Sequence, residues 1–223
     1  ETGVRFDNGL VIISYTLVDT TAPVANPTQS PSAAPSGWNN SNVTVTWNWT
    51  DPSTSAGYVS GIDPANCTTS SVSSGFGTIN LTATCKDLAG NTGTATYQVR
   101  VDPTAPTANP SQSPAANGAG WNNTDVTVNW NWVFTGAIID TANCTTSLTS
   151  SGEGTLTLSA TCADVALNQR TVPYGVKVDK TPPVVTVTGV SDGAAYEVGA
   201  VPTAACSTID ALSGVATQAT VAI

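Results

Sequence analysis

The chain has 223 residues and a formal net charge of −9, and only 9% of its residues are charged. Lys and Arg number six and His is absent. Because nucleic acids and anionic membranes attract clustered basic side chains, we expect neither as a partner. No apolar run approaches the roughly 18 residues of a membrane span, so we expect no membrane insertion. Without His, the most common general base and zinc ligand is missing, and we expect no enzymatic activity.

The first 18 residues belong to none of the repeats described below. Residues 10–18 read Leu-Val-Ile-Ile-Ser-Tyr-Thr-Leu-Val and follow an Asn-Gly turn signal, which predicts a long strand. No partner for this strand is evident in residues 19–223. We therefore expect it either to complete a preceding domain or to act as a donor strand for another chain.

An internal repeat dominates the rest of the chain. The pattern Asp-x-Thr-Ala-Pro-x-Ala-Asn-Pro-x-Gln-Ser-Pro begins at Asp19 and again at Asp102, and a divergent third copy opens at Asp179. The second copy is six residues shorter, and the missing residues lie between Trp49 and Cys67, in a Gly- and Ser-rich stretch that predicts a surface loop. The repeats predict domains at residues 19–101 and 102–178 and an incomplete domain at residues 179–223.

Alternating apolar and polar residues predict strands within each repeat. Residues 43–49, Val-Thr-Val-Thr-Trp-Asn-Trp, would place both Val and both Trp side chains on one buried face. Residues 78–85 and 94–101 alternate likewise, and the second repeat copies all three strands at residues 126–132, 155–162 and 171–178. Since no window shows helical spacing of apolar residues, the sequence predicts an all-β fold of tandem antiparallel β-sandwiches.

Each complete repeat carries two Cys residues 18 positions apart, Cys67 with Cys85 and Cys144 with Cys162. A Gly-x-Gly turn lies midway between them, so a hairpin would bring the two sulfur atoms opposite each other. We therefore expect two disulfides, each stabilising its domain by roughly 3 kcal/mol through loop-closure entropy. A metal site is the alternative, although no His and no Cys-x-x-Cys motif supports it. Cys206 is left unpaired in this chain.

These motifs together resemble bacterial immunoglobulin-like repeats, of the hyalin-like and Big types, over residues 19–223. The resemblance rests on the Asp-x-Thr-Ala-Pro opening, the Trp-Asn-Asn…Val-Thr-Val strand, the turn at residues 83–91 (Ala-Thr-Cys-x-Asp-x-Ala-Gly-Asn) and the closing Tyr-x-Val-x-Val-Asp. It implies tandem immunoglobulin-like sandwiches from a long secreted or cell-surface protein. It also implies that the partner of Cys206 follows downstream.

The loop between the last two strands of each repeat carries an acid and an amide four residues apart. In an immunoglobulin-like sandwich the chain enters at the pole where this loop lies, so the opening Asp should lie close to both. Two interpretations stay open: these side chains form part of a Ca²⁺ site, or the loop Asp closes an Asx turn. No other cofactor is expected. The residues are Asp19, Asp87 and Asn91 in the first repeat and Asp102, Asp164 and Asn168 in the second.

Trp38 and Trp121 precede Asn-Asn at the start of a strand and also allow two interpretations. Exposed indoles would be platforms for stacking sugars, which would make the chain a carbohydrate-binding accessory module of a secreted enzyme with cell-surface glycans as partners. Buried indoles would close one end of each sandwich. The leading hypothesis is a non-catalytic structural module of an extracellular stalk, adhesin shaft or filament. Its partners would be neighbouring immunoglobulin-like domains or identical subunits.

Overall fold

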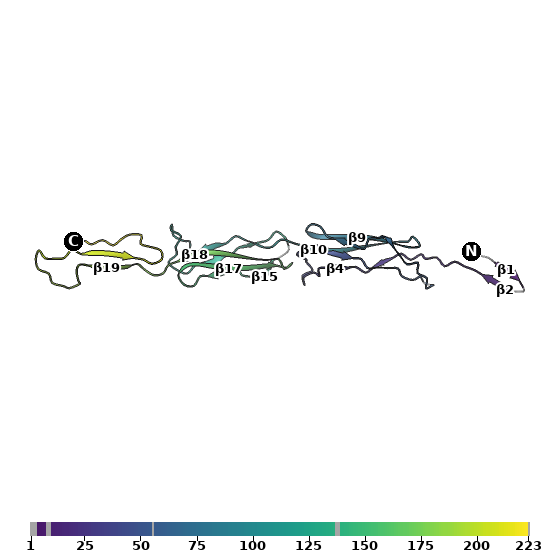
Figure 1. Cartoon of the computed structure of the whole chain (residues 1–223), viewed down its shortest axis with the longest axis horizontal. Coiled ribbons are helices and arrows are strands. Elements are labelled where there is room, and N and C mark those ends of the chain that lie inside the picture. The colour runs from purple at the N-terminus through teal and green to yellow at the C-terminus, as the bar shows by residue number, and fades with distance from the viewer. Residues whose placement is uncertain (1–3, 8–9, 55, 137–138, 223) are drawn as a thin grey trace. The chain divides into compact units, whose positions relative to one another are not determined.

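The computed structural model describes residues 4–7, 10–54, 56–136 and 139–222. The regular structure of these residues consists of β-strands, and the paired strands run antiparallel (Figure 1). The all-β prediction is therefore confirmed. Among the same residues there is no helix with the length and hydrophobicity that a membrane crossing requires.

The chain forms two compact units. The first unit comprises residues 1–105 with 134–140 and 163–168, and the second comprises residues 106–133, 141–162 and 169–223. The first repeat lies in the first unit. This division does not test the domain boundaries at residues 19, 102 and 179, which stay predictions.

The first repeat is a sandwich of short and long sheets. A pair joins β3 (Val24–Ala25) to β6 (Trp49–Thr50). One three-stranded sheet has the order β4 (Thr28–Ser30), β5 (Thr44–Thr46), β8 (Ser70–Val72). The other has the order β10 (Thr92–Val101), β9 (Gly77–Asp87), β7 (Ile62–Cys67).

The second repeat has the same strand order, as its matching sequence predicts. The strand β11 (Thr107–Ala108) pairs with β14 (Trp132–Val133). The sheets are β12 (Ser111–Ser113), β13 (Thr127–Asn129), β16 (Ser147–Thr149) and β15 (Ile139–Cys144), β17 (Gly154–Asp164), β18 (Gln169–Val178). In residues 179–222 one hairpin-like pair joins β19 (Val184–Thr188) to β20 (Ala205–Ile209).

Each repeat has its own hydrophobic core, formed by the inward side chains of the alternating strands. The indole N–H of Trp47 donates to Ser71 Oγ at 3.0 Å, and that of Trp130 donates to the carbonyl of Val172 at 2.9 Å. These bonds satisfy the polar atom of a fully buried Trp. The core residues are Val43, Val45, Trp47, Ala83, Val99 and Val101 in the first repeat and Val126, Val128, Trp130, Ala160, Val176 and Val178 in the second.

The strand predicted at residues 43–49 is interrupted at Asn48, where φ is +47°, and its copy is interrupted at Asn131, where φ is +45°. Asn tolerates this left-handed conformation better than most residues. The Asn48 amide donates to the carbonyl of Asn26 at 3.0 Å and to Thr28 Oγ1 at 3.1 Å, which holds the bend in place. The chain thereby leaves the β4–β5–β8 sheet and pairs with β3, and Trp49 is only half-buried.

The N-terminal strand also differs from its prediction. Strand β2 spans only Leu10–Ile13 and pairs antiparallel with β1 (Val4–Asp7), a partner that the sequence did not reveal. The prediction of a strand continuing to residue 18 is wrong. Tyr15 and Val18 are 74% and 68% exposed, so these side chains do not form the buried face that a half-buried strand would have.

Candidate functional site

The opening Asp of every repeat closes a turn on its own backbone. The N–H group of Thr21 donates to Asp19 Oδ1 at 2.9 Å, that of Thr104 to Asp102 Oδ1 at 2.9 Å, and that of Thr181 to Asp179 Oδ1 at 3.1 Å. All three Asp residues are buried. An Asp carboxylate that accepts the N–H two residues later is an Asx turn, which gives the Asp-x-Thr motif a local structural reason.

A second N–H group reaches the same carboxylate from a loop further along the chain. The N–H of Ser60 donates to Asp19 Oδ2 at 2.8 Å, and the N–H of Ser213 donates to Asp179 Oδ2 at 2.9 Å. The bond from Thr21, followed by that from Ser60, lowers the pKa of Asp19. The hydroxyl and N–H groups of Ser213 lower the pKa of Asp179 in the same way. Both carboxylates are therefore bound in their charged form.

The second repeat holds its opening Asp against a shorter loop. A Cβ atom built on Gly136 would lie 2.2 Å from Asp102 Oδ2, closer than any real contact. Only Gly fits there without displacing the carboxylate, so the shorter loop lies directly against Asp102 at Gly136.

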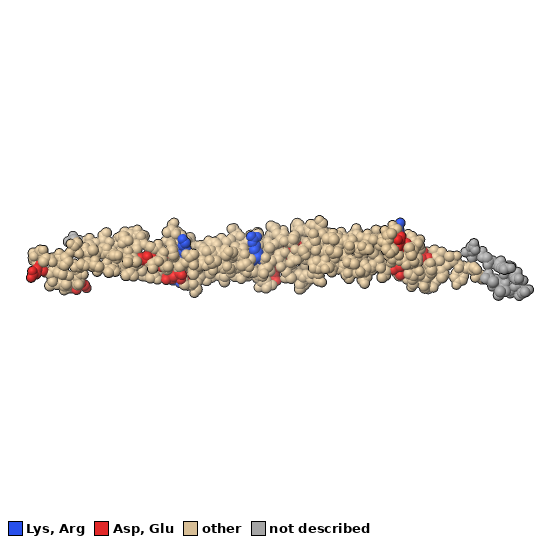
Figure 2. All heavy atoms as spheres, viewed as in Figure 1, with Lys and Arg blue, Asp and Glu red and all other residues tan. Residues whose placement is uncertain are grey.

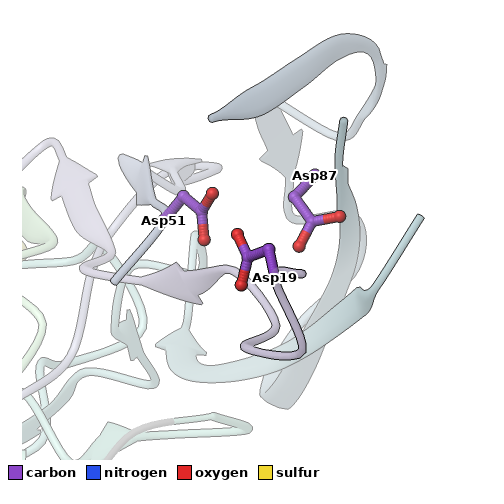
Figure 3. Close-up of side chains that lie close together, drawn as sticks. All are labelled: Asp19, Asp51 and Asp87. Carbon is purple, nitrogen blue, oxygen red and sulfur yellow. The ribbon is translucent and has the colours of Figure 1, made fainter. Parts of the chain in front are cut away.

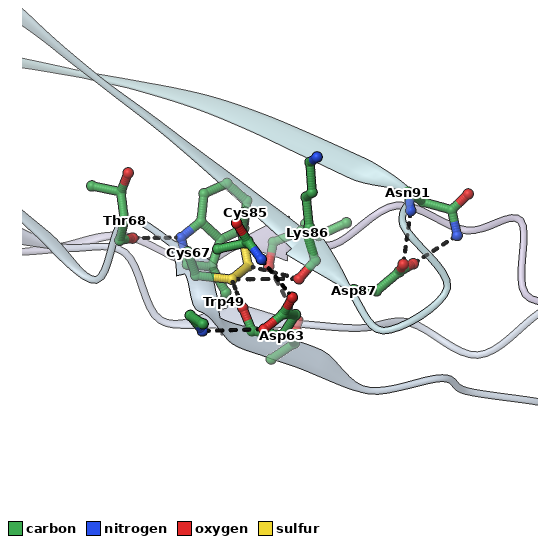
Figure 4. Close-up of a disulfide and its surroundings, with 12 residues drawn as sticks. Trp49, Asp63, Cys67, Thr68, Cys85, Lys86, Asp87 and Asn91 are labelled. Atoms are coloured by element: carbon green, nitrogen blue, oxygen red, sulfur yellow. Dashed lines mark hydrogen bonds between the residues drawn. A yellow bond between two sulfur atoms is a disulfide. The ribbon is translucent and has the colours of Figure 1, made fainter.

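The predicted acid–amide turns lie beside these carboxylates. Asn91 donates its backbone N–H to Asp87 Oδ1 at 2.8 Å and its amide Nδ2 to Asp87 Oδ2 at 2.7 Å. The same Nδ2 donates to the carbonyl of Asp19 at 3.2 Å (Figure 4 shows the Asp87–Asn91 bonds). Gly90, at φ +93°, makes the turn that brings Asn91 back to Asp87. The structure thus brings together the three residues that the sequence grouped in the first repeat.

The second repeat repeats this arrangement with its own three residues. Asn168 donates its N–H to Asp164 Oδ1 at 2.9 Å and its Nδ2 to Asp164 Oδ2 at 2.8 Å and to the carbonyl of Asp102 at 2.7 Å. Leu167, at φ +69°, takes the position of Gly90. In both repeats the amide nitrogen faces the acids and positions them.

A third carboxylate joins the first repeat alone. Asp51, in the loop after β6, places an oxygen within 4.8 Å of oxygens of Asp19 and Asp87, and the three side chains point toward one another (Figure 3). Its Oδ2 accepts bonds from the N–H of Gly61 at 2.7 Å and the hydroxyl of Ser60 at 3.2 Å. Its Oδ1 is buried without a hydrogen-bond partner.

This cluster has unbalanced negative charge. Like charges this close repel one another, and a buried carboxylate oxygen without a donor is costly. The salt bridge found among the described residues, Lys180 Nζ to Asp125 Oδ1 at 2.6 Å, involves none of the three acids. Carboxylate oxygens are the ligands that Ca²⁺ prefers, so a bound cation would compensate both features. The residue 83 positions after Asp51 is Phe134, so the second repeat lacks the third acid.

The cysteines of each repeat form a cross-strand disulfide. Cys67 of β7 is bonded to Cys85 of β9, directly opposite in the strand register (Figure 4). Cys144 is bonded to Cys162 in the second repeat. Among the described residues Cys206 is the free thiol; it is half-buried, with Sγ 3.0 Å from the carbonyl of Ala219.

Trp38 and Trp121, the predicted sugar platforms, are both half-buried. Lys177 places its Nζ over the ring of Trp121, 5.7 Å from the centroid, in cation–π geometry. This contact uses one face of the Trp121 ring. Sugar stacking on Trp38 and Trp121 stays a prediction.

Charged side chains are sparse on the molecular surface. Figure 2 shows large areas of the visible face without Lys, Arg, Asp or Glu. Five of the acids, Asp19, Asp87, Asp102, Asp164 and Asp179, are buried in the turns described above. One third of the 15 acidic residues therefore lie inside the repeats.

Comparison with known proteins yields little. No known family profile matches the sequence, and no curated protein matches it. Among solved structures, the chain is similar to fibronectin(III)-like modules of CbhA from Clostridium thermocellum, at 15% identity and a TM-score of 0.31. The match covers 69% of this chain and 93% of that one. A likeness this distant carries no argument about function.

Proposed function

We propose that this chain is a non-catalytic structural module of an extracellular bacterial stalk, adhesin shaft or filament. The observation that supports this most is the direct succession of the repeats. Strand β10 ends at Val101, and the next residue, Asp102, already closes the opening turn of the second repeat on Thr104. Val178 and Asp179 repeat the arrangement. Successive repeats without spacer residues suit a protein whose task is length rather than catalysis.

Two further features support a site outside the cell. Each complete repeat contains a disulfide, and structural disulfides persist in oxidising compartments. The low density of charge and the many Ser and Thr residues on the strands suit a durable exported protein. The partners in this proposal are neighbouring immunoglobulin-like domains or identical subunits.

As part of the same structural role, we propose that the first repeat binds Ca²⁺ with Asp19, Asp51 and Asp87. Support comes from the buried, partnerless Oδ1 of Asp51 in a cluster of three acids. These carboxylates would hold the ion, and the ion would tie the entering chain, the loop after β6 and the end of β9 together. Because Phe134 replaces the third acid, the second repeat would hold its pole together by hydrogen bonds alone.

The compartment is tested by trapping thiols in intact cells that produce the protein. Cells are quenched in acid, and free thiols are then alkylated with a reagent of known mass before the chain is isolated. The proposal expects Cys67, Cys85, Cys144 and Cys162 to escape alkylation. Alkylation of these four residues in most of the chains would show a reducing compartment and overturn the extracellular assignment.

A further inference from the structure

Strand β7 (Ile62–Cys67) is an edge strand that follows its neighbour incompletely. It aligns with β9 at Ile62, opposite Asp87, and at Cys67, opposite Cys85, and the register shifts in between. Asp63 Oδ1 accepts a bond from the N–H of Ala65 at 3.2 Å, so this side chain bonds within β7 and not to β9. Pro64, inside the strand, has no N–H to donate to the sheet. The middle of β7 is therefore poorly attached to β9.

The same strand adds little to the hydrophobic core. None of its six residues is fully buried, and Pro64, Ala65 and Asn66 are exposed. The core cluster of the first repeat is formed by residues 43–47, by β9 and by β10. Removing β7 from its place would leave that cluster intact, because burial of apolar side chains holds the two sheets together elsewhere.

Residues 58–67, which comprise this strand and the turn before it, are held at both ends. At one end, the N–H groups of Ser60 and Gly61 donate to the carboxylates of Asp19 and Asp51, and the carbonyl of Gly61 accepts a bond from the N–H of Leu88 at 2.9 Å. At the other end stands the Cys67–Cys85 disulfide. Immediately beyond it the chain is fixed to the core, because Thr68 donates its N–H to Thr84 and accepts a bond from the indole of Trp49.

From this arrangement we propose that residues 58–67 form a segment that opens as a unit when the Cys67–Cys85 disulfide is reduced, while the rest of the first repeat stays folded. Opening uncovers the indole of Trp49, because Trp49, Ile62, Pro64 and Cys67 line one hollow of about 260 Å³. It also withdraws Ser60 and Gly61 from the carboxylates. The disulfide thus holds this segment against β9, and its reduction releases the segment.

The chemical step is thiol–disulfide exchange with a dithiol reductant. One reductant thiolate attacks a sulfur of the Cys67–Cys85 bond, and the second thiolate resolves the mixed disulfide. The reductant ends as a cyclic disulfide. Cys67 and Cys85 each gain one electron and one proton and end as thiols.

The test is hydrogen exchange, measured by mass spectrometry, on wild type and on the double variant C67A/C85A. Calcium is chelated in all samples, so the result does not depend on the proposed Ca²⁺ site. We expect amides of residues 58–67 to exchange at least about tenfold faster in the variant, and those of β5, β9 and β10 to change by less than about threefold. Equal acceleration in all these strands, or none in residues 58–67, would overturn the proposal.

A matched control is the variant C144A/C162A, which removes the disulfide of the second repeat. It should leave exchange in residues 58–67 as in wild type. If C67A/C85A does not fold, the variant C144A/C162A with and without dithiothreitol provides the comparison, because its remaining disulfide is Cys67–Cys85. A further variant, Asp51→Ala, removes the carboxylate that binds the N–H of Gly61 and leaves the bond from Ser60 to Asp19. Exchange in residues 58–67 should then still be faster in the reduced protein than in the oxidised one.

Discussion

The carbonyl of Asn39 accepts a hydrogen bond from the N–H group of Asp102 at 2.8 Å. Asn122 and Asp179 form the same bond at the same distance. Asn39 also pairs in parallel with Val101 at the end of β10. The Trp-Asn-Asn motif of one repeat is thereby joined to the residue that opens the next. Asp102 ends one repeat through its N–H group and begins another through its carboxylate.

Replacing Asn39 should weaken the first repeat. Its Nδ2 donates to the carbonyl of Arg100 at 3.1 Å, its Oδ1 accepts from Gln29 at 3.2 Å, and it is buried. Asn39→Ala removes both of these side-chain hydrogen bonds from a buried position, so the free energy of unfolding should fall by about 1–3 kcal/mol in urea denaturation. The neighbouring Asn40 is exposed, and Asn40→Ala should change it by less than about 0.5 kcal/mol. Equal effects of the two substitutions would contradict this role of Asn39.

The opening Asp should make stability depend on pH. The hydrogen bonds from Thr21 and Ser60 lower the pKa of Asp19 in the folded chain. A lowered folded pKa adds stability above the unfolded pKa of about 3.9 and loses it as pH falls through the folded pKa. In buffer with a calcium chelator, Asp19→Asn should therefore have a lower melting temperature than wild type at pH 7. The difference between the two melting temperatures should become smaller below about pH 4. A gap that stays constant from pH 7 to pH 2.5 would refute the assignment.

Replacing Asp51 should change the melting temperature in opposite directions in the presence and in the absence of Ca²⁺. With Ca²⁺ present, Asp51→Asn should lower the melting temperature, because it removes one of three charged ligands. With chelator present, the same variant should melt at or above wild type, because it relieves the repulsion from Asp19 and Asp87 and removes a carboxylate whose Oδ1 is buried without a hydrogen-bond partner.

Wild type, unlike Asp51→Asn, should show a marked Ca²⁺-dependent rise in melting temperature, measured by scanning calorimetry. Asp164→Asn in the second repeat is the control. It should destabilise equally with and without Ca²⁺, since that pole lacks a third acid. A melting temperature of wild type that does not change between Ca²⁺ and chelator would rule out the site.

Strand β10 should not tolerate a side chain at Gly93. A Cβ atom there would lie 2.0 Å from the backbone oxygen of Pro23, in the chain that leads into β3. Gly93→Ala must displace this backbone and should cost about 1–3 kcal/mol or more in unfolding free energy. Gly175 of β18 has open space at its Cβ, so Gly175→Ala should be neutral or slightly stabilising. Comparable stability of both variants in urea denaturation would disprove the contact.

The sequence predicted the sandwich strands and the core because alternation along a strand reports directly which side chains face inward. It missed Asp51 for a physical reason: this residue lies where the second repeat is shorter, so comparing repeats discards it. A usable signal was present. Asp51 precedes Ser60-Gly61, and Asp210 precedes Ser213-Gly214, and in both cases the Gly N–H binds the Asp carboxylate.

The break at Asn48 was equally hidden. In an alternating pattern an Asn between two Trp residues looks like any outward polar residue. Only the amide bonds to Asn26 and Thr28, from a strand distant in sequence, hold the left-handed backbone there. Such a bend depends on tertiary contacts, and periodicity carries no information about them.

The central claim is that the chain is a structural module on the outside of the cell. Immunogold electron microscopy tests it most directly, using antibodies raised against residues 19–178 on intact, unpermeabilised cells that produce the protein. The account predicts gold particles along stalks, fibres or the outer surface. Label that appears only after permeabilisation, and then throughout the cytoplasm, would contradict it.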